Sequence, residues 1–457
     1  MISFKLSELA VFGNYLLKGN DLEISSVSTD SRACRDALFV ALIGERFDAH
    51  DFIEKAIENG AVAVLASRKL PERIENRVAV VYCDDTQRAF GICGYLVRRK
   101  FKGTVASLTG SCGKTTVKEF TNSILLENGS SMCTEGNFNN DIGVPKTLLR
   151  LDNSFRFAVI EQGASHLFDN AHTCEFVKAD TALINNIGGA HIEGFGSFDG
   201  IYRGKSQIID DVLSRGGMAA VPSDDDYYRR WESDYKASIR DGRLVSFGSH
   251  DFDLVQYMNV KTSKDGLDFT LRADTKTFDV HMNVLGEHNA KNAAAACALA
   301  LISGADVNTL ASGLNRASTL KGRLSLKKMS NYCVIDDAYN ASFNAVIAAI
   351  DTLSSLDGHR VLVFGDMGEL GSEAESLHAK VGEYAKGRID ELLCLGKLTQ
   401  YTVNAFDGSS KHFNLHEDLI QYAQNLIKMQ EYTSFLVKGS HSMHMDKVSE
   451  ALTCCEE

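Results

Sequence analysis

Short runs of apolar residues alternate with segments of helical periodicity along most of the chain, which is the pattern of an α/β protein. In the first part, one segment with helical spacing predicts a helix that ends at Gly60. We interpret this part as a small α/β module. Its helix is predicted over 51–59, and its strands over 24–27, 38–42, 61–66 and 78–82.

A helix predicted from Asp84 onward leads into a second part, in which apolar runs and helical segments follow each other regularly. This alternation favours a mostly parallel sheet covered by helices. Between 253 and 284 the pattern becomes strand-rich and polar and apolar residues alternate, as in antiparallel strands. A third part begins after about Leu320. The strands predicted for the second part are 157–160, 181–185 and 218–222, and those for the third are 332–335, 360–364, 391–395 and 434–437.

A glycine-rich loop, Thr-Gly-Ser-Cys-Gly-Lys-Thr-Thr, lies between an apolar strand-like stretch and a helix-like stretch. In phosphate-binding loops of this layout, backbone N–H groups approach the phosphate oxygens, a lysine reaches the terminal phosphates and the next hydroxyl holds Mg²⁺. These roles fall here to Gly110 and Gly113, to Lys114 and to Thr115. The strict eight-residue pattern contains a further glycine that this shorter form lacks. A turn that binds nothing is disfavoured, because a lysine and two threonines at a helix start contribute little to packing.

Length and composition narrow the class of protein. A chain of 457 residues exceeds what one hydrophobic core usually supports, so two or three domains are expected. No apolar run is long enough to span a membrane, and the N-terminus lacks the features of a secretory signal. Eleven cysteines without a Cys-x-x-Cys pair indicate reduced thiols and a cytoplasmic location. The net charge of -12 disfavours a nucleic-acid-binding protein.

Three polar side chains near predicted strand ends extend the candidate site. Glu161 ends a buried strand, where ligand sites of open α/β sheets lie, and its carboxylate could hold Mg²⁺ beside Thr115. His191 follows the next strand and would enter the same crevice, although a lone histidine there is more often a loop or core residue. Lys205 lies on a predicted helix, and its spacing alone favours a solvated surface lysine.

Separated motifs together resemble the Mur ligase family of ATP-dependent amide-forming enzymes, in order along essentially the whole chain. Beside the glycine loop these are Glu-Gly-Asn-Phe-Asn-Asn-Asp-Ile-Gly-Val-Pro at 135–145 and Leu-Gly-Glu-His-Asn-Ala-Lys-Asn at 285–292. Three further motifs are similar to those of the family member that adds D-alanyl-D-alanine to the UDP-N-acetylmuramoyl tripeptide. They are Ser-Thr-Asp-Ser-Arg at 28–32 with the segment 38–50, Asp-Asp-Ala-Tyr-Asn-Ala at 336–341, and Gly-Asp-Met-Gly-Glu-Leu-Gly at 365–371 with Val-Lys-Gly-Ser at 437–440.

The resemblance implies an α/β protein of three domains. These are a small N-terminal α/β uridine-binding module over 1–83, a central P-loop ATPase-like parallel sheet over 84–317 and a C-terminal Rossmann-like domain over 318–457, which would bind the dipeptide. It further implies ATP and two Mg²⁺ ions, with UDP-N-acetylmuramoyl tripeptide and D-alanyl-D-alanine as substrates, in an ADP-forming ligase of peptidoglycan synthesis. We expect a monomer.

The resemblance also implies roles for individual positions. Lys205 is expected to be carbamoylated, because an ammonium cannot ligate Mg²⁺ whereas a carbamate offers anionic oxygens. The catalytic positions are Lys114, Glu161, His191 and Lys205, and the metal positions are Thr115, Glu161, His191 and Lys205. The ATP positions are Thr109, Gly110, Ser111, Cys112, Gly113, Lys114, Thr115, Thr116, His288, Asn289, Asn292, Arg323 and Asp337. The uridine diphosphate positions are Ser31 and Arg32.

Some residues depart from the family pattern and leave alternatives open. The most serious is His441, where the family commonly has an arginine, because a titratable ring replaces a permanent fork of donors. Another Mur-type amide ligase is one alternative, either the enzyme that adds the third peptide residue or a folate- or cyanophycin-type relative. A nucleotide-binding relative that has lost catalysis is another, and the intact Lys114, Glu161 and Lys205 argue against it.

Overall fold

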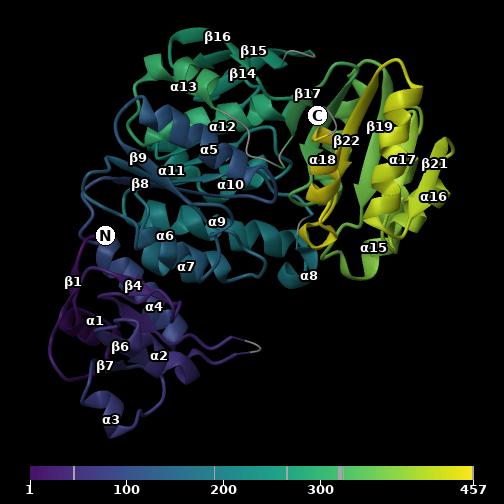
Figure 1. Cartoon of the computed structure of the whole chain (residues 1–457). Coiled ribbons are helices and arrows are strands. Elements are labelled where there is room, and N and C mark those ends of the chain that lie inside the picture. The colour runs from purple at the N-terminus through teal and green to yellow at the C-terminus, as the bar shows by residue number, and fades with distance from the viewer. Residues whose placement is uncertain (45–46, 190, 264–265, 318–321, 323, 455–457) are drawn as a thin grey trace.

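The computed structural model describes residues 1–44, 47–189, 191–263, 266–317, 322 and 324–454. Figure 1 shows three parts in chain order, the N-terminal part at the lower left, the central part in the middle and the C-terminal part on the right. Each part contains a main sheet flanked by helices, so the predicted three-domain α/β architecture is confirmed. The boundaries given above for the domains stay predictions.

The described residues of the N-terminal part form a five-stranded sheet in the order β2-β7-β6-β5-β4, and a separate pair β1-β3. The single strand predicted over 24–27 is wrong, because two serines interrupt it and its halves pair with different sheets. The helix predicted over 51–59 is found as a 3₁₀ turn, Ala49–Phe52, followed by α2. The elements are β1 Phe4–Lys5, α1 Leu6–Gly13, β2 Leu16–Lys18, β3 Glu23–Ile24, β4 Val27–Ser28, β5 Leu38–Val40, α2 Ile53–Glu58, β6 Ala63–Ala66, α3 Glu72–Glu75 and β7 Ala79–Tyr82.

The central part contains a nine-stranded sheet, counted over its described residues, in the order β16-β15-β14-β13-β12-β11-β8-β10-β9. The strands from β9 to β14 are parallel, and β15 and β16 are added antiparallel, as the change of pattern after 253 predicts. The strands are β8 Thr104–Thr109, β9 Ser131–Cys133, β10 Phe157–Glu161, β11 Thr181–Ile184, β12 Met218–Pro222, β13 Leu244–Gly248, β14 Val255–Ser263, β15 Gly266–Ala273 and β16 Lys276–Met282. The helices are α4 Thr86–Arg98, α5 Lys114–Leu126, α6 Gly143–Leu148, α7 Asp169–Val177, α8 Ile192–Phe195, α9 Phe198–Ser214, α10 Tyr228–Asp234, α11 Lys236–Arg240, α12 His288–Ile302 and α13 Leu310–Arg316.

Helices cover both faces of the central sheet. Successive residues of β8 alternate between the two layers, as the pleat of a strand requires: Val105 packs with α4, α6, α7 and α9, and Ala106 with α5, α12 and α13. Burial on both faces explains why these strands read as continuous apolar runs in the sequence.

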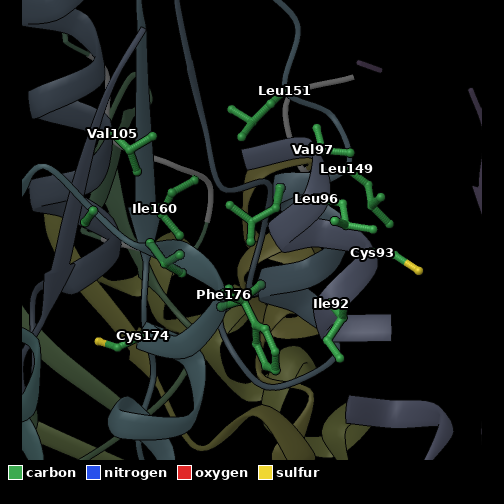
Figure 2. Packing of buried hydrophobic residues seen from close by; sticks show 14 of the residues in the cluster. Ile92, Cys93, Leu96, Val97, Val105, Leu149, Leu151, Ile160, Cys174 and Phe176 are labelled. Atoms are coloured by element: carbon green, nitrogen blue, oxygen red, sulfur yellow. The ribbon is translucent and has the colours of Figure 1, made fainter. Parts of the chain in front are cut away.

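Helix α4 joins the N-terminal part to the strand that precedes the glycine loop. Its first turn is capped by Asp85, whose carboxylate accepts hydrogen bonds from two backbone N–H groups. Figure 2 shows Ile92, Leu96 and Val97 of α4 in one buried cluster with Phe176 of α7. The apolar face of α4 therefore ties the N-terminal part to the central sheet and fixes where β8 begins.

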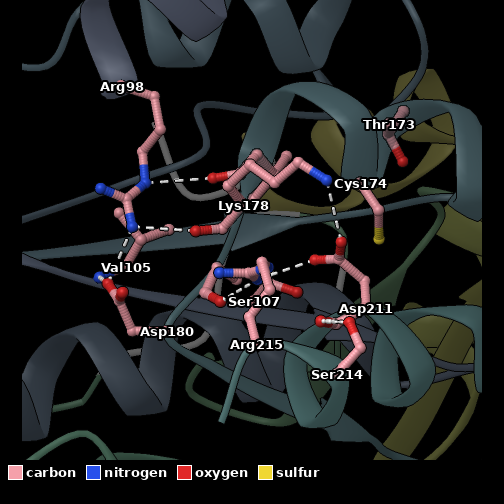
Figure 3. A network of polar contacts seen from close by, with 12 residues as sticks. Arg98, Val105, Ser107, Thr173, Cys174, Lys178, Asp180, Asp211, Ser214 and Arg215 are labelled. Atoms are coloured by element: carbon pink, nitrogen blue, oxygen red, sulfur yellow. Dashed lines mark hydrogen bonds and ion pairs between the residues drawn. The ribbon is translucent and has the colours of Figure 1, made fainter. Parts of the chain in front are cut away.

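A polar network holds the C-terminal end of α4 (Figure 3). The Arg98 guanidinium donates to the carbonyl oxygens of Val177 (3.1 Å) and Lys178 (2.9 Å), at the end of α7, and to the Asp180 carboxylate (2.9 Å). Asp180 also accepts from the Val105 N–H at 2.8 Å. One buried arginine thus joins α4 to the end of α7 and, through Asp180, to the start of β8. It also satisfies carbonyl groups at the end of α7 that lack an intrahelical partner.

Replacing Arg98 with Ala is expected to lower the free energy of unfolding by about 2 kcal/mol or more, because buried carbonyl acceptors lose their donor. Chemical denaturation monitored by circular dichroism measures the change. The neighbouring Arg99 is exposed, so Arg99→Ala serves as the matched control and should change stability by less than about 0.5 kcal/mol. Equal stability of the two variants would show that the network contributes little.

In the C-terminal part, the described residues form a six-stranded sheet, β17-β18-β22-β19-β20-β21, parallel except for β17. The four predicted strands are confirmed. The edge strands β17 and β21 were not predicted, because they are polar and lack an apolar run. The strands are β17 Ser325–Lys328, β18 Tyr332–Asp337, β19 His359–Gly365, β20 Glu391–Leu395, β21 Ser409–Phe413 and β22 Thr433–Lys438. The helices are α14 Phe343–Ser354, α15 Ala374–Ala385, α16 Thr399–Ala405, α17 His416–Met429 and α18 Asp446–Thr453. None of the helices in the described ranges has the length and apolarity to cross a membrane.

Candidate active site

The glycine loop lies at the carboxyl end of β8, between Thr109, the last residue of that strand, and Lys114, the first residue of α5. This is the strand, loop and helix that the sequence predicts. Gly113 has a φ of +73°, and a Cβ there would lie 2.6 Å from the side-chain nitrogen of Asn185 and 2.7 Å from the side-chain oxygen of Asn292. Both the backbone conformation and the lack of space therefore require glycine at this position.

Two adjacent asparagines that follow β11, Asn185 and Asn186, form hydrogen bonds with the backbone of the glycine loop. Asn186 accepts from the Cys112 N–H at 2.9 Å, and the side chains of Asn185 and Asn186 both donate to the Cys112 carbonyl, at 2.9 and 3.0 Å. Ser111 exchanges hydrogen bonds with the backbone of Gly188, at 3.0 and 2.8 Å. No role was predicted for Asn185 and Asn186 from the sequence, although polar residues directly after a buried strand often lie at a ligand site.

Two of the three predicted nucleotide residues of α12, Asn289 and Asn292, are connected by hydrogen bonds to Asn185, which supports this loop. Asn292 accepts from Asn185 at 3.0 Å and donates to Asn289 at 2.9 Å, and Asn289 donates to the Leu285 carbonyl at 2.7 Å. One of these hydrogen bonds connects α12 to Asn185, which supports the loop, and the other two lie at the start of α12. The contact of these residues with a nucleotide stays a prediction. Burial and the positive charge of Lys438 lower the pKa of His288 to about 4, so its ring is neutral.

Lys114 and the residues around it present polar groups at the mouth of the loop. The Lys114 ammonium donates to the Gly110 carbonyl at 2.9 Å, so it lies folded over the loop. The Thr109 hydroxyl is buried and has no hydrogen-bond partner among the described residues. Thr115 is buried in the first turn of α5, and Thr116 beside it is partly exposed.

Glu161 ends β10, one strand away from the loop, in register with Leu108. The carboxylate is almost completely buried at 1% exposure. Its Oε1 accepts from the Asn139 side chain at 2.7 Å, whereas Oε2 has no partner among the described residues. Burial of an uncompensated carboxylate oxygen is costly, so this atom is a candidate ligand for a cation. Asn139 lies in the quoted 135–145 motif, but the sequence analysis gave it no role.

Lys205 lies on α9 and is fully buried, at 0% exposure. The surface position that spacing alone favours is therefore wrong, because this face of the helix packs into the domain interior. Its Nζ has no hydrogen-bond partner in the described ranges and lies 5.3 Å from the centre of the Phe195 ring. Burial, and then the charge of Lys114, lower the pKa of Lys205 well below its usual value. Burial therefore disfavours the ammonium form of Lys205, whereas the neighbouring ring favours a cation.

His191 begins the short helix α8 in the left-handed backbone conformation, with φ +58°. Its Nδ1 lies 2.7 Å from Oε2 of Glu369, which belongs to the C-terminal part. Burial lowers the pKa of His191, Glu369 opposes that shift, and the charges of Lys114 and Lys205 add to it. Three of the four catalytic positions assigned from the sequence, Lys114, Lys205 and His191, interact electrostatically. The fourth, Glu161, lies one strand from the loop that carries Lys114.

The C-terminal part brings Asp337 and Lys438 to the same region. These residues end the neighbouring parallel strands β18 and β22, and Lys438 Nζ lies 2.5 Å from an Asp337 oxygen and 2.9 Å from the Asn340 carbonyl. The charge of Lys438 also lowers the pKa of His288, the first residue of α12. The predicted role of Arg323 falls on a residue outside the described part of the chain.

Ser31 and Arg32 lie in the N-terminal part, in the loop after β4, far in sequence from the other predicted site residues. The exposed guanidinium of Arg32 forms a two-pronged pair with Asp30, at 2.9 and 2.8 Å, and lowers the pKa of Asp30 to about 2. Ser31 and Arg32 line a cavity of about 410 Å³ together with the exposed rings of Phe47 and Phe52. A second cavity of about 330 Å³ shares Asp30 and reaches the central domain; from there its lining includes Lys146, Leu149 and Arg150. Both volumes are in the range of small-molecule sites.

Within the described ranges, no three His, Cys, Asp or Glu side chains converge in a way that could hold a metal ion. What this region offers a metal is different: one carboxylate oxygen of Glu161 without a partner among the described residues, a threonine hydroxyl, and the buried amine of Lys205. Such a set becomes a good site for Mg²⁺ only if phosphate oxygens and a further anionic oxygen join it.

Three family models match separate segments of the chain. They are described as "Mur ligase family, catalytic domain" over residues 23–93, "Mur ligase middle domain" over 108–300, and "Mur ligase, glutamate ligase domain" over 322–441. The chain is also similar to the UDP-N-acetylmuramoyl-tripeptide--D-alanyl-D-alanine ligase of Escherichia coli (strain K12). The two are 39% identical, over 99% of each chain.

Two solved structures resemble the whole molecule. A crystal structure of MurF from Acinetobacter baumannii superposes with a TM-score of 0.91 at 32% identity, covering 99% of both chains. The MurF ligase of Thermotoga maritima, in complex with ADP, superposes with a TM-score of 0.82 at 25% identity, covering 94% of this chain and 97% of that one.

Proposed function

Because this chain belongs to the Mur ligase family, we propose that it is the ATP-dependent ligase that adds D-alanyl-D-alanine to the UDP-N-acetylmuramoyl tripeptide in peptidoglycan synthesis. The observation that carries the substrate assignment is the end-to-end similarity to the Escherichia coli ligase of that name. The intact Lys114, Glu161 and Lys205, in a buried site at the carboxyl edge of the central sheet, support activity rather than a scaffold that has lost catalysis.

The chemistry has two steps. ATP phosphorylates the terminal carboxylate of the tripeptide, which yields an acyl phosphate and ADP. The amine of the dipeptide then attacks the acyl carbon, and inorganic phosphate leaves with the bonding electron pair as the amide forms. In the first step an anion approaches an anion, so Lys114 is assigned to offset the charge of the terminal phosphates.

The residues of the site fit a divalent cation. We assign Thr115 and Glu161 to one Mg²⁺, and His191 with a carbamoylated Lys205 to a second. When bound, such ions neutralise phosphate charge and polarise the transferring phosphoryl group. The fit rests on the buried carboxylate oxygen of Glu161, which has no partner among the described residues, while Asn139 holds the other oxygen in place.

Lys205 fits carbamoylation for a separate reason. Lys205 is buried, its pKa is lowered by that burial, and it has no hydrogen-bond partner in the described chain. Its ammonium is therefore more readily deprotonated than that of a solvated lysine, and the free amine is a nucleophile towards CO₂. Its nitrogen lone pair forms the N–C bond, one C=O electron pair moves to oxygen, and the nitrogen releases a proton. The product is an anion, which the nearby cation Lys114 stabilises.

The remaining assignments follow the geometry of the three domains. The N-terminal cavities, with Ser31 and Arg32 in one and Lys146 and Arg150 in the other, are proposed to hold the uridine diphosphate end of the substrate. Asp337 and the residues of the α12 start are proposed to contact the nucleotide. Closure of the C-terminal domain would exclude water from the acyl phosphate. We also propose a cytoplasmic monomer, consistent with free thiols at the ten described cysteines.

Phosphate release from ATP tests the proposed function. The enzyme is supplied with the UDP-tripeptide and D-alanyl-D-alanine, and in parallel with the UDP-dipeptide and a diamino acid, and with a folate acceptor and glutamate. We expect turnover only with the first pair, and release of one phosphate for each amide formed. Turnover with another pair would identify a different Mur-type ligase, and none with any pair would favour a relative that has lost catalysis.

A further inference from the structure

The side chains of Asn185 and Asn186 hold the backbone of one residue in the glycine loop, Cys112. Its carbonyl oxygen accepts hydrogen bonds from both side-chain amides, at 2.9 and 3.0 Å. The Asn186 side chain also accepts from the Cys112 N–H at 2.9 Å, so one amide binds both polar backbone groups of the same residue. Neither asparagine has a role in the reaction steps given above.

The segment that follows β11 also binds the N–H group of the preceding loop residue. The backbone carbonyl of Asn186 accepts from the Ser111 N–H at 3.1 Å. The Ser111 hydroxyl exchanges hydrogen bonds with the backbone of Gly188. The N–H groups of Ser111 and Cys112 therefore face this segment, and they are already bonded within the protein.

The N–H groups at the start of α5 are left to bind an anion. Those of Gly113, Thr115 and Thr116 have no hydrogen-bond partner among the described residues. Unpaired N–H groups at a helix start, together with the helix dipole, favour phosphate. A carbonyl oxygen turned towards the same place would repel a phosphate oxygen, because both carry negative charge. The direction of each loop carbonyl therefore matters for nucleotide binding.

The direction of the Cys112 carbonyl also determines where the Gly113 N–H points. These two groups belong to one planar, trans peptide unit, in which C=O and N–H point in opposite directions. Because both asparagine amides hold the carbonyl on the side of the segment after β11, the Gly113 N–H is directed away from that segment. The positive φ of Gly113, +73°, then leads the chain into α5.

The two asparagines differ in what else they contact. Asn185 is fully buried and also donates to Asn292 of α12 at 3.0 Å, so its removal would disturb a second element. Asn186 is partly exposed, and every side-chain hydrogen bond that it makes with the described residues goes to Cys112. Substitution of Asn186 therefore changes the loop most directly.

We propose that Asn186 is a positioning residue for the nucleotide: together with Asn185, it holds the Cys112 carbonyl away from the phosphates and directs the Gly113 N–H towards them. This inference rests on the proposed function, because it takes the glycine loop as the phosphate site of ATP. Asn186 acts through the loop backbone, so its loss changes nucleotide affinity and leaves the affinity for the other two substrates as it is.

A purely structural role for Asn186 predicts a loss of stability without a change in nucleotide affinity. The matched control is Asn128, which lies just after the other end of α5 and is partly buried like Asn186. Its side chain donates to the Ile124 carbonyl and the Thr309 hydroxyl, both at 2.9 Å, and accepts from the Asp306 N–H at 2.8 Å. Asn128→Ala thus removes a comparable set of hydrogen bonds without contact to the loop.

Calorimetric titration with ADP and Mg²⁺ measures nucleotide affinity, and steady-state ligation gives KM for each substrate. Asn186→Ala is expected to weaken ADP binding, and to raise KM for ATP, by about 10-fold, because a backbone donor to phosphate is misdirected. Asn186→Asp keeps the size of the side chain and the acceptor for the Cys112 N–H, but it has no donor for the carbonyl. It should lose at least as much affinity, and KM for the tripeptide and for the dipeptide should stay unchanged in both variants.

The results separate the two roles. Wild-type ADP affinity in both Asn186 variants, an equal loss in Asn128→Ala, or an equal rise in KM for the tripeptide would overturn the inference. Asn186→Asp keeps the test valid if Asn186→Ala does not fold, which urea denaturation shows. A wild-type enzyme that binds ADP but releases no phosphate with the tripeptide and dipeptide would instead refute the proposed function, so the two failures are distinguishable.

Discussion

Replacing Lys114 with Ala is expected to lower kcat/KM for phosphate release by roughly 10³-fold, equivalent to about 4 kcal/mol of transition-state stabilisation. The lost ammonium lies folded over the glycine loop, where it donates to the Gly110 carbonyl and can turn to the phosphates. Without it, the negative charge of the transferring phosphoryl group lies beside the Glu161 carboxylate with less compensation. Coupled-assay measurement of phosphate release at saturating ATP and tripeptide gives the value.

The control for this prediction is Lys428→Ala, which removes the same charge from an exposed position on α17. That variant should retain wild-type kcat/KM. Circular dichroism should show that Lys114→Ala is folded, since its side chain is only partly buried. If Lys114→Ala released phosphate at the rate of the Lys428→Ala enzyme, the phosphate-loop assignment would be wrong.

Replacing Lys205 with Ala is expected to lower the ligation rate by about 10²- to 10³-fold. Short-chain carboxylates are expected to restore part of that rate. The truncation opens space in the interior where the buried amine now lies. A carboxylate such as acetate can enter that space and supply the anionic oxygens that the carbamate supplies in the wild type. The measurement is ligation rate as a function of acetate concentration at constant ionic strength.

Two variants make the acetate experiment specific. Lys205→Met keeps the volume of the side chain, so it should be inactive and acetate should not restore it. Lys114→Ala has lost a cation, so acetate should not help it either. With ¹³C-labelled bicarbonate, the wild type should show a carbamate resonance by NMR that Lys205→Met lacks. Activity of Lys205→Ala equal to that of the wild type would refute a role for Lys205 in the reaction.

Local periodicity predicted most of the fold correctly. The four predicted strands of the six-stranded C-terminal sheet contain apolar runs because both of their faces are buried. Strands that are not buried on both faces were missed or wrongly bounded, because they lack a continuous apolar run. The edge strands β17 and β21 are polar, and the segment 24–27 divides between two sheets at a pair of serines.

The candidate site shows a similar division. The glycine loop was recognisable because its spacing is a local property: in loops of this kind, the N–H groups that bind phosphate come from one loop and one helix start. Spacing did not single out Lys205, since its place on a helix is that of a solvated residue, and only the family resemblance assigned it a role. Only the packing of α9 shows that its amine is buried and without a hydrogen-bond partner in the described chain, and that burial lowers its pKa.

By itself, the sequence determined the α/β class, the order of the three domains and the phosphate loop, because apolar period and loop spacing are set by neighbouring residues. The tertiary structure alone decided which distant side chains meet. Asn185 supports the loop from another strand, Asn139 orients Glu161 from a separate motif, and Glu369 reaches His191 from another domain. These contacts depend on strand order and domain docking, where sequence separation carries no information about distance.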